Sequence, residues 1–151
     1  MSDRINGKVV AISVSEAKGV AKTNVNSATL KQEWGIEGDA HAGEWHRQVS
    51  LLAIESVDKM RAKGLDVGPG AFAENITTQG IPLPELPIGS SLQLGDCELE
   101  ITQIGKECHT RCAIYFQAGD CVMPKEGIFA RVIKGGTISV NDPVVASVTK
   151  D

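Results

Sequence analysis

Short apolar segments separated by glycine and proline follow one another along the whole sequence, which favours a fold built mainly from strands. Residues 7–14 are rich in β-branched side chains and predict a first strand, and residues 48–53 predict a later one. The 16 glycines and 6 prolines among 151 residues are spread out and mark no linker. Many short strands joined by such turns are typical of a β-barrel or a sandwich, so we expect a single domain over residues 1–151.

Two segments have the layout of a β-hairpin. Residues 91–102 contain a central Gly-Asp dipeptide, and residues 137–149 contain a central Asn-Asp dipeptide. Both dipeptides tolerate the positive φ that tight hairpin turns require. In the first segment, Cys97 is in register with Leu99 and Ile101, and polar residues alternate with them. We therefore expect a strand with one face in the core and Cys97 as a core residue.

One segment shows a clear helical period. Apolar residues within 54–63 recur at helical spacing, and Gly64 follows as a stop signal. Residues 18–47 show neither the helical nor the strand period, so we expect a long irregular segment there. Residues 71–78 predict a strand, which is followed by a proline-rich turn region. The expected fold is mostly β and barrel-like, with one or two short helices.

Composition and charge limit the classes of partner. Hydrophobic residues make up 42% of the chain and charged residues 23%, and no apolar run approaches the roughly 20 residues of a membrane-spanning helix. The net charge is -4, opposite in sign to that of a typical nucleic-acid-binding protein. The first residues do not resemble a signal peptide. We therefore expect a cytoplasmic protein with no membrane and no nucleic-acid partner.

A glycine-rich segment, residues 35–50, combines several groups that can bind an anion. Asp39 and His41 lie among three glycines, and Arg47 and Ser50 follow them. Such a loop can bring backbone N–H groups and an arginine side chain to one anionic ligand. The alternative is a solvated loop in which Asp39 caps its own turn and the histidines are exposed.

Three of the four cysteines lie close together, between Cys108 and Cys121. Arg111 precedes Cys112, and a neighbouring positive charge favours the thiolate form of a cysteine, so Cys112 is the preferred reactive thiol. One alternative is a structural zinc site formed by Cys108, His109, Cys112 and Cys121. Another is that these cysteines are small buried hydrophobic residues.

Taken in order, these segments resemble the MOSC family, which includes the C-terminal domain of molybdenum cofactor sulfurases and small stand-alone bacterial proteins. The resemblance spans nearly the whole chain. It is carried by Gly38-Asp-Ala-His-Ala-Gly43, His46-Arg-Gln-Val-Ser-Leu-Leu52, Phe72-Ala-Glu-Asn-Ile-Thr77, Pro87-Ile-Gly89, Leu94-Gly-Asp96, Arg111-Cys112, Gly127-Ile-Phe-Ala-Arg-Val132, Gly135-Gly136 and Asn141-Asp142.

The resemblance implies a barrel-like fold with a cleft for the pterin-based molybdenum cofactor, molybdopterin. The family's characteristic cysteine corresponds to Cys112, which would carry a persulfide or ligate molybdenum. By position, the residues implied to line the cleft beside Cys112 are Asp39, His41, Arg47, Ser50, Glu74, Asn75 and Arg111.

The function implied is molybdenum cofactor binding, or sulfur carriage in the sulfuration or delivery of that cofactor, without pyridoxal phosphate. The expected partners are a cysteine desulfurase or other sulfur donor, and a client molybdoenzyme or cofactor-synthesis protein. One alternative is a molybdenum-dependent reductase of N-hydroxylated compounds. Another is a non-catalytic structural zinc-binding or assembly protein. Only the reductase requires molybdenum to change its oxidation state on this chain.

Overall fold

The computed structural model describes residues 3–16, 22–40, 42–64, 66–72, 74–105 and 126–148. Strands dominate these residues, as the turn pattern of the sequence predicts. The elements are β1 (Asp3–Val14), β2 (Thr23–Val25), β3 (Ser27–Lys31), β4 (Gly35–Ile36), β5 (Val49–Ala53), α1 (Ile54–Ala62), β6 (Ile76–Gln79), the 3-10 helix η1 (Leu83–Glu85), β7 (Ser91–Leu94), β8 (Cys97–Ile104), β9 (Ile128–Lys134), β10 (Gly136–Ser139) and β11 (Pro143–Val148).

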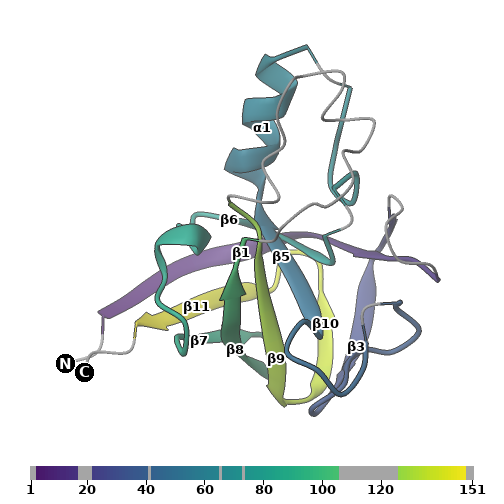
Figure 1. Cartoon of the computed structure of the whole chain (residues 1–151), viewed down its shortest axis with the longest axis vertical. Helices are drawn as coiled ribbons and strands as arrows, with labels where there is room; N and C mark the ends of the chain where they lie inside the picture. The colour runs from purple at the N-terminus through teal and green to yellow at the C-terminus, as the bar shows by residue number, and fades with distance from the viewer. Residues whose placement is uncertain are drawn as a thin grey trace.

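Seven of the described strands close into a barrel (Figure 1). Their order is β11, β7, β8, β9, β5, β6 and β1, and pairing between β1 and β11 completes the ring. Neighbouring strands are antiparallel except β5 and β6, which are parallel and lie on either side of α1 in the sequence. Strands β10, β3 and β4 form a separate three-stranded sheet. The mostly-β, barrel-like prediction with short helices is confirmed.

The barrel interior is filled by side chains that point inward at alternate positions along the strands. In β8, Cys97, Leu99 and Ile101 are buried and the residues between them are partly exposed. This confirms Cys97 as a core residue. Burial raises the pKa of the Cys97 thiol, and the nearby carboxylates of Asp96 and Asp142 raise it further.

A second apolar cluster covers part of the outer surface of the barrel. Leu52 points out from β5 and packs with Val57 and Met60 of α1 and with Phe72 and Phe129. Figure 1 shows α1 at one end of the barrel, directly beyond β5. Strand β5 is therefore buried on both faces, which explains why all five of its residues are apolar or small.

The helix predicted at residues 54–63 is confirmed as α1. Gly64 follows it with a φ of +90°, a conformation that L-residues with side chains rarely adopt. Its N–H donates to the carbonyl of Arg61 over 3.0 Å and so ends the helix. No helix among the described residues is long and apolar enough to span a membrane.

Three sequence-based expectations are wrong in detail. Residues 18–47 are not irregular throughout, because β2, β3 and β4 lie within this range. The segment 137–149 is not a hairpin: β10 pairs with β3, whereas β11 pairs with β7 and β1. The predicted turn does form, and Asn141 has a φ of +77°. However, the backbone of Asn141 and Asp142 hydrogen-bonds to Val9 of β1, and β10 and β11 do not pair with each other.

The third correction concerns the strand predicted at residues 71–78. Strand β6 begins only at Ile76, because the preceding backbone turns at Gly70, whose φ is +92°. The N–H of Ala71 donates to the carbonyl of Gly68 over 3.1 Å within this turn. Glu74 and Asn75 therefore lie before β6, whereas the sequence predicts them within a strand.

Candidate functional site

The loop between β4 and β5 is fixed to the end of β1. The N–H of Ala40 donates to the carbonyl of Ser15 over 2.8 Å, and the N–H of Gly43 donates to the carbonyl of Trp34 over the same distance. These bonds place the glycine-rich segment beside the residues that follow β1. Over the residues described, these backbone bonds hold the loop to the end of β1, while Glu44, Trp45 and His46 within it are exposed.

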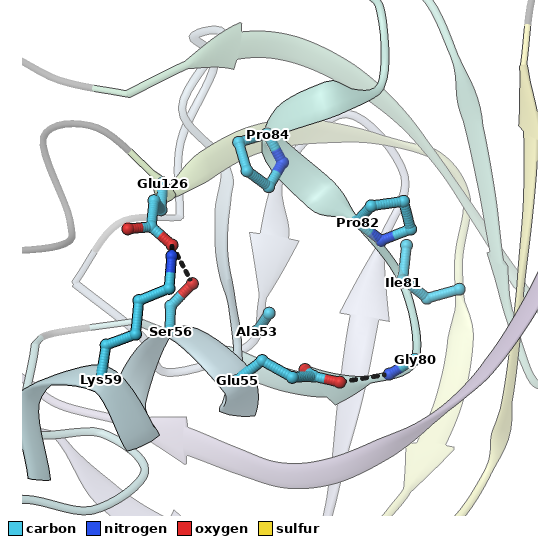
Figure 2. A pocket seen from close by; sticks show the side chains of 9 residues that line it. All are labelled: Ala53, Glu55, Ser56, Lys59, Gly80, Ile81, Pro82, Pro84 and Glu126. Atoms are coloured by element: carbon cyan, nitrogen blue, oxygen red, sulfur yellow. Dashed lines mark hydrogen bonds and ion pairs between the residues drawn. The ribbon is translucent and has the colours of Figure 1, made fainter. Parts of the chain in front are cut away.

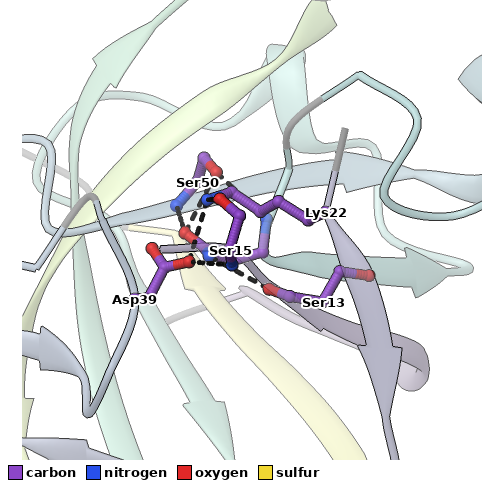
Figure 3. Close-up of polar contacts among 6 residues, drawn as sticks. Ser13, Ser15, Lys22, Asp39 and Ser50 are labelled. Carbon is purple, nitrogen blue, oxygen red and sulfur yellow. Dashed lines mark hydrogen bonds and ion pairs between the residues drawn. The ribbon is translucent and has the colours of Figure 1, made fainter. Parts of the chain in front are cut away.

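Asp39 forms a buried ion pair with Lys22 (Figure 3). Lys22 Nζ lies 2.8 Å from Asp39 Oδ1, and both side chains are fully buried, with 0% exposed. Nζ also donates to Ser15 Oγ over 2.9 Å, and the Ser15 N–H donates to Asp39 Oδ1 over 3.0 Å. These hydrogen bonds compensate two charges removed from water, so Asp39 holds the loop in place from within.

The backbone around Lys22 is packed against Gly70. The Lys22 N–H donates to the carbonyl of Gly70 over 2.8 Å. A Cβ at position 70 would lie 2.6 Å from the Lys22 carbonyl oxygen and would also meet Ser13. Only glycine fits this close approach at positive φ, so the segment that carries Lys22 and the turn before β6 are joined.

Ser50 and Asn75 form a second buried polar group. Asn75 Oδ1 accepts from the backbone N–H of Ser50 over 3.0 Å and from Ser50 Oγ over 3.1 Å. Asn75 Nδ2 donates to the carbonyl of Ser13 over 3.1 Å. One amide therefore connects β1, β5 and the entry to β6, and both side chains lie at 0% exposure.

Glu74 is buried in its own turn. Its Oε1 accepts the N–H of Phe72 over 3.1 Å, and Thr77 Oγ1 donates to Oε2 over 3.4 Å. Burial raises the pKa of the Glu74 carboxyl, and the hydrogen bonds from the turn oppose this shift. The carboxyl therefore stabilises the turn that leads into β6.

Arg47 is partly buried, and its guanidinium lies on the outer surface of the barrel beside Phe129. Its Nε donates to Gln103 Oε1 over 3.0 Å, and its central carbon lies 5.2 Å from the centroid of the Phe129 ring. Phe129 is the register partner of Ser50 across β5 and β9. Within the described residues, neither terminal Nη atom of Arg47 has a hydrogen-bond partner. These atoms are suited to bind an anion.

Two pockets lie near these elements. One, of about 410 Å³, borders the loop at His46. Its lining residues are Glu33, Glu44, Trp45, His46, Gln48 and Arg131. The other lies between α1 and η1 and contains no predicted site residue (Figure 2). In it, the exposed Lys59 pairs with Glu126 over 2.8 Å.

The structure brings together some of the predicted residues and leaves others untested. Hydrogen bonds link Ser50 with Asn75, and Ser13 and Ser15, near the end of β1, contact Asn75 and Asp39 respectively. Three predicted site residues lie outside the described residues: His41, Arg111 and Cys112. The same holds for the other members of the alternative zinc set, which are Cys108, His109 and Cys121. The described ranges hold no group of three or more His, Cys, Asp or Glu residues placed to bind a metal.

Sequence reasoning missed Lys22 and Gln103. Lys22 lies in a stretch without periodicity, and its partner Asp39 is distant in the sequence, so no local pattern marks the pair. Gln103 gives a weak signal, because it breaks the alternation of β8 where the register with β9 shifts between Ile101 and Gln103. Such irregularities often re-aim a side chain.

Comparison with known proteins agrees with this geometry. A family model described as the MOSC domain matches residues 38–145, which include the glycine-rich loop, β5, Asn75 and Gln103. The chain belongs to the MOSC domain family. No match was found among proteins of curated function.

Solved structures show the same fold at low sequence identity. The YuaD protein from Bacillus subtilis matches with a TM-score of 0.84 and 17% identity, covering 99% of this chain and 100% of that one. YiiM from Geobacillus stearothermophilus matches with a TM-score of 0.68 and 20% identity, covering 93% and 74%. YiiM from Escherichia coli matches with a TM-score of 0.64 and 20% identity, covering 95% and 71%.

The buried ion pair predicts a large loss of stability when one partner is removed. Lys22→Met should lower the free energy of unfolding by about 3 to 5 kcal/mol, because it leaves Asp39 charged and buried without its cation. Lys59→Met is the matched control: the Lys59–Glu126 pair has the same 2.8 Å separation, but the Lys59 side chain is 62% exposed. Its loss should be below about 1 kcal/mol. Equal losses in urea denaturation would contradict the structural role of Lys22.

The raised pKa of Glu74 predicts a pH-dependent contribution to stability. A carboxyl whose pKa is higher in the folded state favours folding fully below its unfolded pKa, and this contribution is lost as the pH rises through the folded pKa. Glu74→Gln removes the titration. The stability of the natural protein relative to this variant should therefore fall as the pH rises above 4.5, the ordinary pKa of a glutamate, as measured by urea denaturation. A pH-independent difference would show that burial does not control this carboxyl.

Proposed function

We propose that this MOSC protein binds molybdopterin-based molybdenum cofactor at the outer surface where Arg47 lies, beside β5 and the entry to β6, and that it acts in sulfuration or delivery of that cofactor. The observation that carries the proposal is the guanidinium of Arg47. It is held against Phe129 and Gln103, and its terminal Nη atoms have no partner within the described residues. This arginine lies in the segment that matches the MOSC family.

The donor set suits the phosphate of such a cofactor. A guanidinium presents parallel N–H donors whose geometry matches two phosphate oxygens. The nearby ammonium of Lys22 is engaged by Asp39 and Ser15, so it serves the protein rather than a ligand. Among these two cations, Arg47 is the one we assign to the phosphate.

The other predicted residues divide into two groups. Four of them are buried, and their hydrogen bonds are to other groups of this protein: Asp39, Ser50, Glu74 and Asn75. We assign them to holding the loop and the turn that frame the surface. His41 and Arg111 remain proposed cofactor contacts from the sequence resemblance.

Cys112 is the proposed sulfur- or molybdenum-binding residue. As a sulfur carrier, its thiolate would attack the terminal sulfur of a donor persulfide, such as that of a cysteine desulfurase. The new S–S bond forms on Cys112, the donor S–S bond breaks, and the donor cysteine leaves as a thiolate, so no external oxidant is consumed. In the cytoplasm, a thiolate of a cofactor-synthesis protein or a client molybdoenzyme would then attack the outer sulfur, and Cys112 would leave as a thiolate. A further thiol would supply the two electrons that release this sulfur as sulfide for the cofactor.

When bound, the cofactor would supply molybdenum that accepts sulfur or changes oxidation state. A reductase of N-hydroxylated compounds would use the second property and would need an electron donor. The carrier role needs only binding and a nucleophilic thiol. We favour the carrier role because it has fewer requirements than the reductase, which also needs an electron donor.

The role of Arg47 predicts weaker cofactor binding when its charge is removed. Arg47→Ala should lose about 1.5 to 3 kcal/mol of binding free energy, the range for a charged hydrogen bond. Fluorescence titration of the apoprotein with molybdopterin measures this loss. Arg4→Ala, at an exposed position of β1, is the matched control and should bind normally. Full affinity in a folded Arg47→Ala protein would remove this residue from the site.

The role of Cys112 predicts its reactivity relative to Cys97. Limiting alkylation of the native protein should label Cys112 first and Cys97 last, because burial raises the pKa of the Cys97 thiol. After incubation with a cysteine desulfurase, cyanolysis should detect sulfur on the natural protein and on Cys108→Ser, but not on Cys112→Ser. Sulfur retained by Cys112→Ser, or a Cys112 thiol slower than Cys97, would refute the carrier role.

A further inference from the structure

The side chain of Gln103 contacts the proposed anion-binding arginine and its neighbour. Gln103 Oε1 lies 3.0 Å from Arg47 Nε and 2.8 Å from His46 Nε2. A carbonyl oxygen can only accept, so both nitrogens donate to it. One acceptor at the end of β8 therefore fixes two consecutive side chains of the glycine-rich loop.

The orientation of the Gln103 amide is itself determined by the chain. Gln103 Nε2 donates to the carbonyl of Gly105 over 2.7 Å, which requires Oε1 to face Arg47. The Gly105 carbonyl is held in turn, because the Gly105 N–H donates to the carbonyl of Gly127 over 2.6 Å. The Gln103 amide therefore links the side chain of Arg47 to the paired ends of β8 and β9.

The residue before Gln103 fixes the same loop through its backbone. Thr102 Oγ1 donates to the carbonyl of His46 and lies 3.2 Å from the carbonyl of Phe129. The Phe129 ring supplies the face on which Arg47 rests. The loop backbone, the Nε atom and one face of the guanidinium are therefore all restrained by β8 and β9.

We propose that Gln103 is the positioning residue for Arg47 in anion binding. By accepting the Nε–H, it orients the guanidinium so that the edge carrying the two terminal amino groups is left to the ligand. A guanidinium held in this way loses less side-chain entropy when it binds a phosphate. This inference rests on the proposed function, because it assigns the ligand of Arg47 as the cofactor phosphate.

A double-mutant cycle on molybdopterin affinity tests the inference. Gln103→Ala should weaken binding about two- to tenfold, because it removes the orientation of the Arg47 guanidinium but leaves its charge. In an Arg47→Ala background the same substitution should cause no further loss, because Gln103 acts only through Arg47. Gln93→Ala, at an exposed glutamine of β7, is the control and should change neither background.

A measurement without ligand tests the geometry separately. The Arg47 Nε–H should give an NMR signal protected from solvent exchange in the natural protein, and this protection should be lost in Gln103→Ala. Gln103→Glu keeps an acceptor for Arg47 and removes the donor to Gly105, so it should retain at least part of the protection. Gln103→Met removes both the acceptor and the donor at a similar side-chain length, so it serves as the second variant, with the same expected loss, if Gln103→Ala does not fold.

The outcomes separate this inference from the proposed function. If Arg47→Ala binds the cofactor normally, the proposed function fails and the inference fails with it. If Arg47→Ala binds weakly while the Gln103→Ala effect is absent or simply adds to it, only the positioning role is overturned. Unchanged Arg47 Nε–H protection in Gln103→Ala, or in Gln103→Met if the alanine variant does not fold, also overturns it.

Discussion

The pairing of β1 with β11 is the constraint on which the rest of the structure depends. Residues Asp3–Lys8 pair with β11 along one edge, and later residues of β1 pair with β6 and β2. This closes the barrel and removes the open edges that would otherwise expose unpaired backbone groups. It also fixes the end of β1, where Ser13 and Ser15 hold Asn75 and Asp39. The frame of the candidate site is thus a consequence of barrel closure.

Two cations near this frame have different environments, and the difference explains their proposed roles. Lys22 is fully buried and neutralised by Asp39, so its charge contributes to folding. Arg47 is only partly buried, and among the described residues its guanidinium contacts an aromatic ring and a neutral amide rather than a carboxylate. A cation without a carboxylate partner at a surface is the feature that attracts an anionic ligand. This contrast is the basis on which we propose Arg47 as the anion-binding residue.

The parts of the fold that could be predicted are those encoded by neighbouring residues. The alternation around Leu99 gave the correct burial of β8, and the period ending at Gly64 gave α1. Long-range pairing could not be predicted: β10 joins β3 instead of β11, and Lys22 finds Asp39 across a stretch without any pattern. For the site, the sequence identified Arg47 as a candidate but not Gln103, whose role depends on three-dimensional contacts.

The central claim is that this MOSC protein carries molybdenum cofactor, and co-purification tests it most directly. The protein should be isolated from cells competent in cofactor synthesis, analysed for molybdenum, and assayed for the fluorescence of its oxidised pterin. A cofactor-dependent molybdoenzyme isolated in parallel shows that the preparation preserves the cofactor. The account predicts molybdenum and pterin together in similar molar amounts. A folded protein that contains neither, beside a loaded molybdoenzyme, would contradict it.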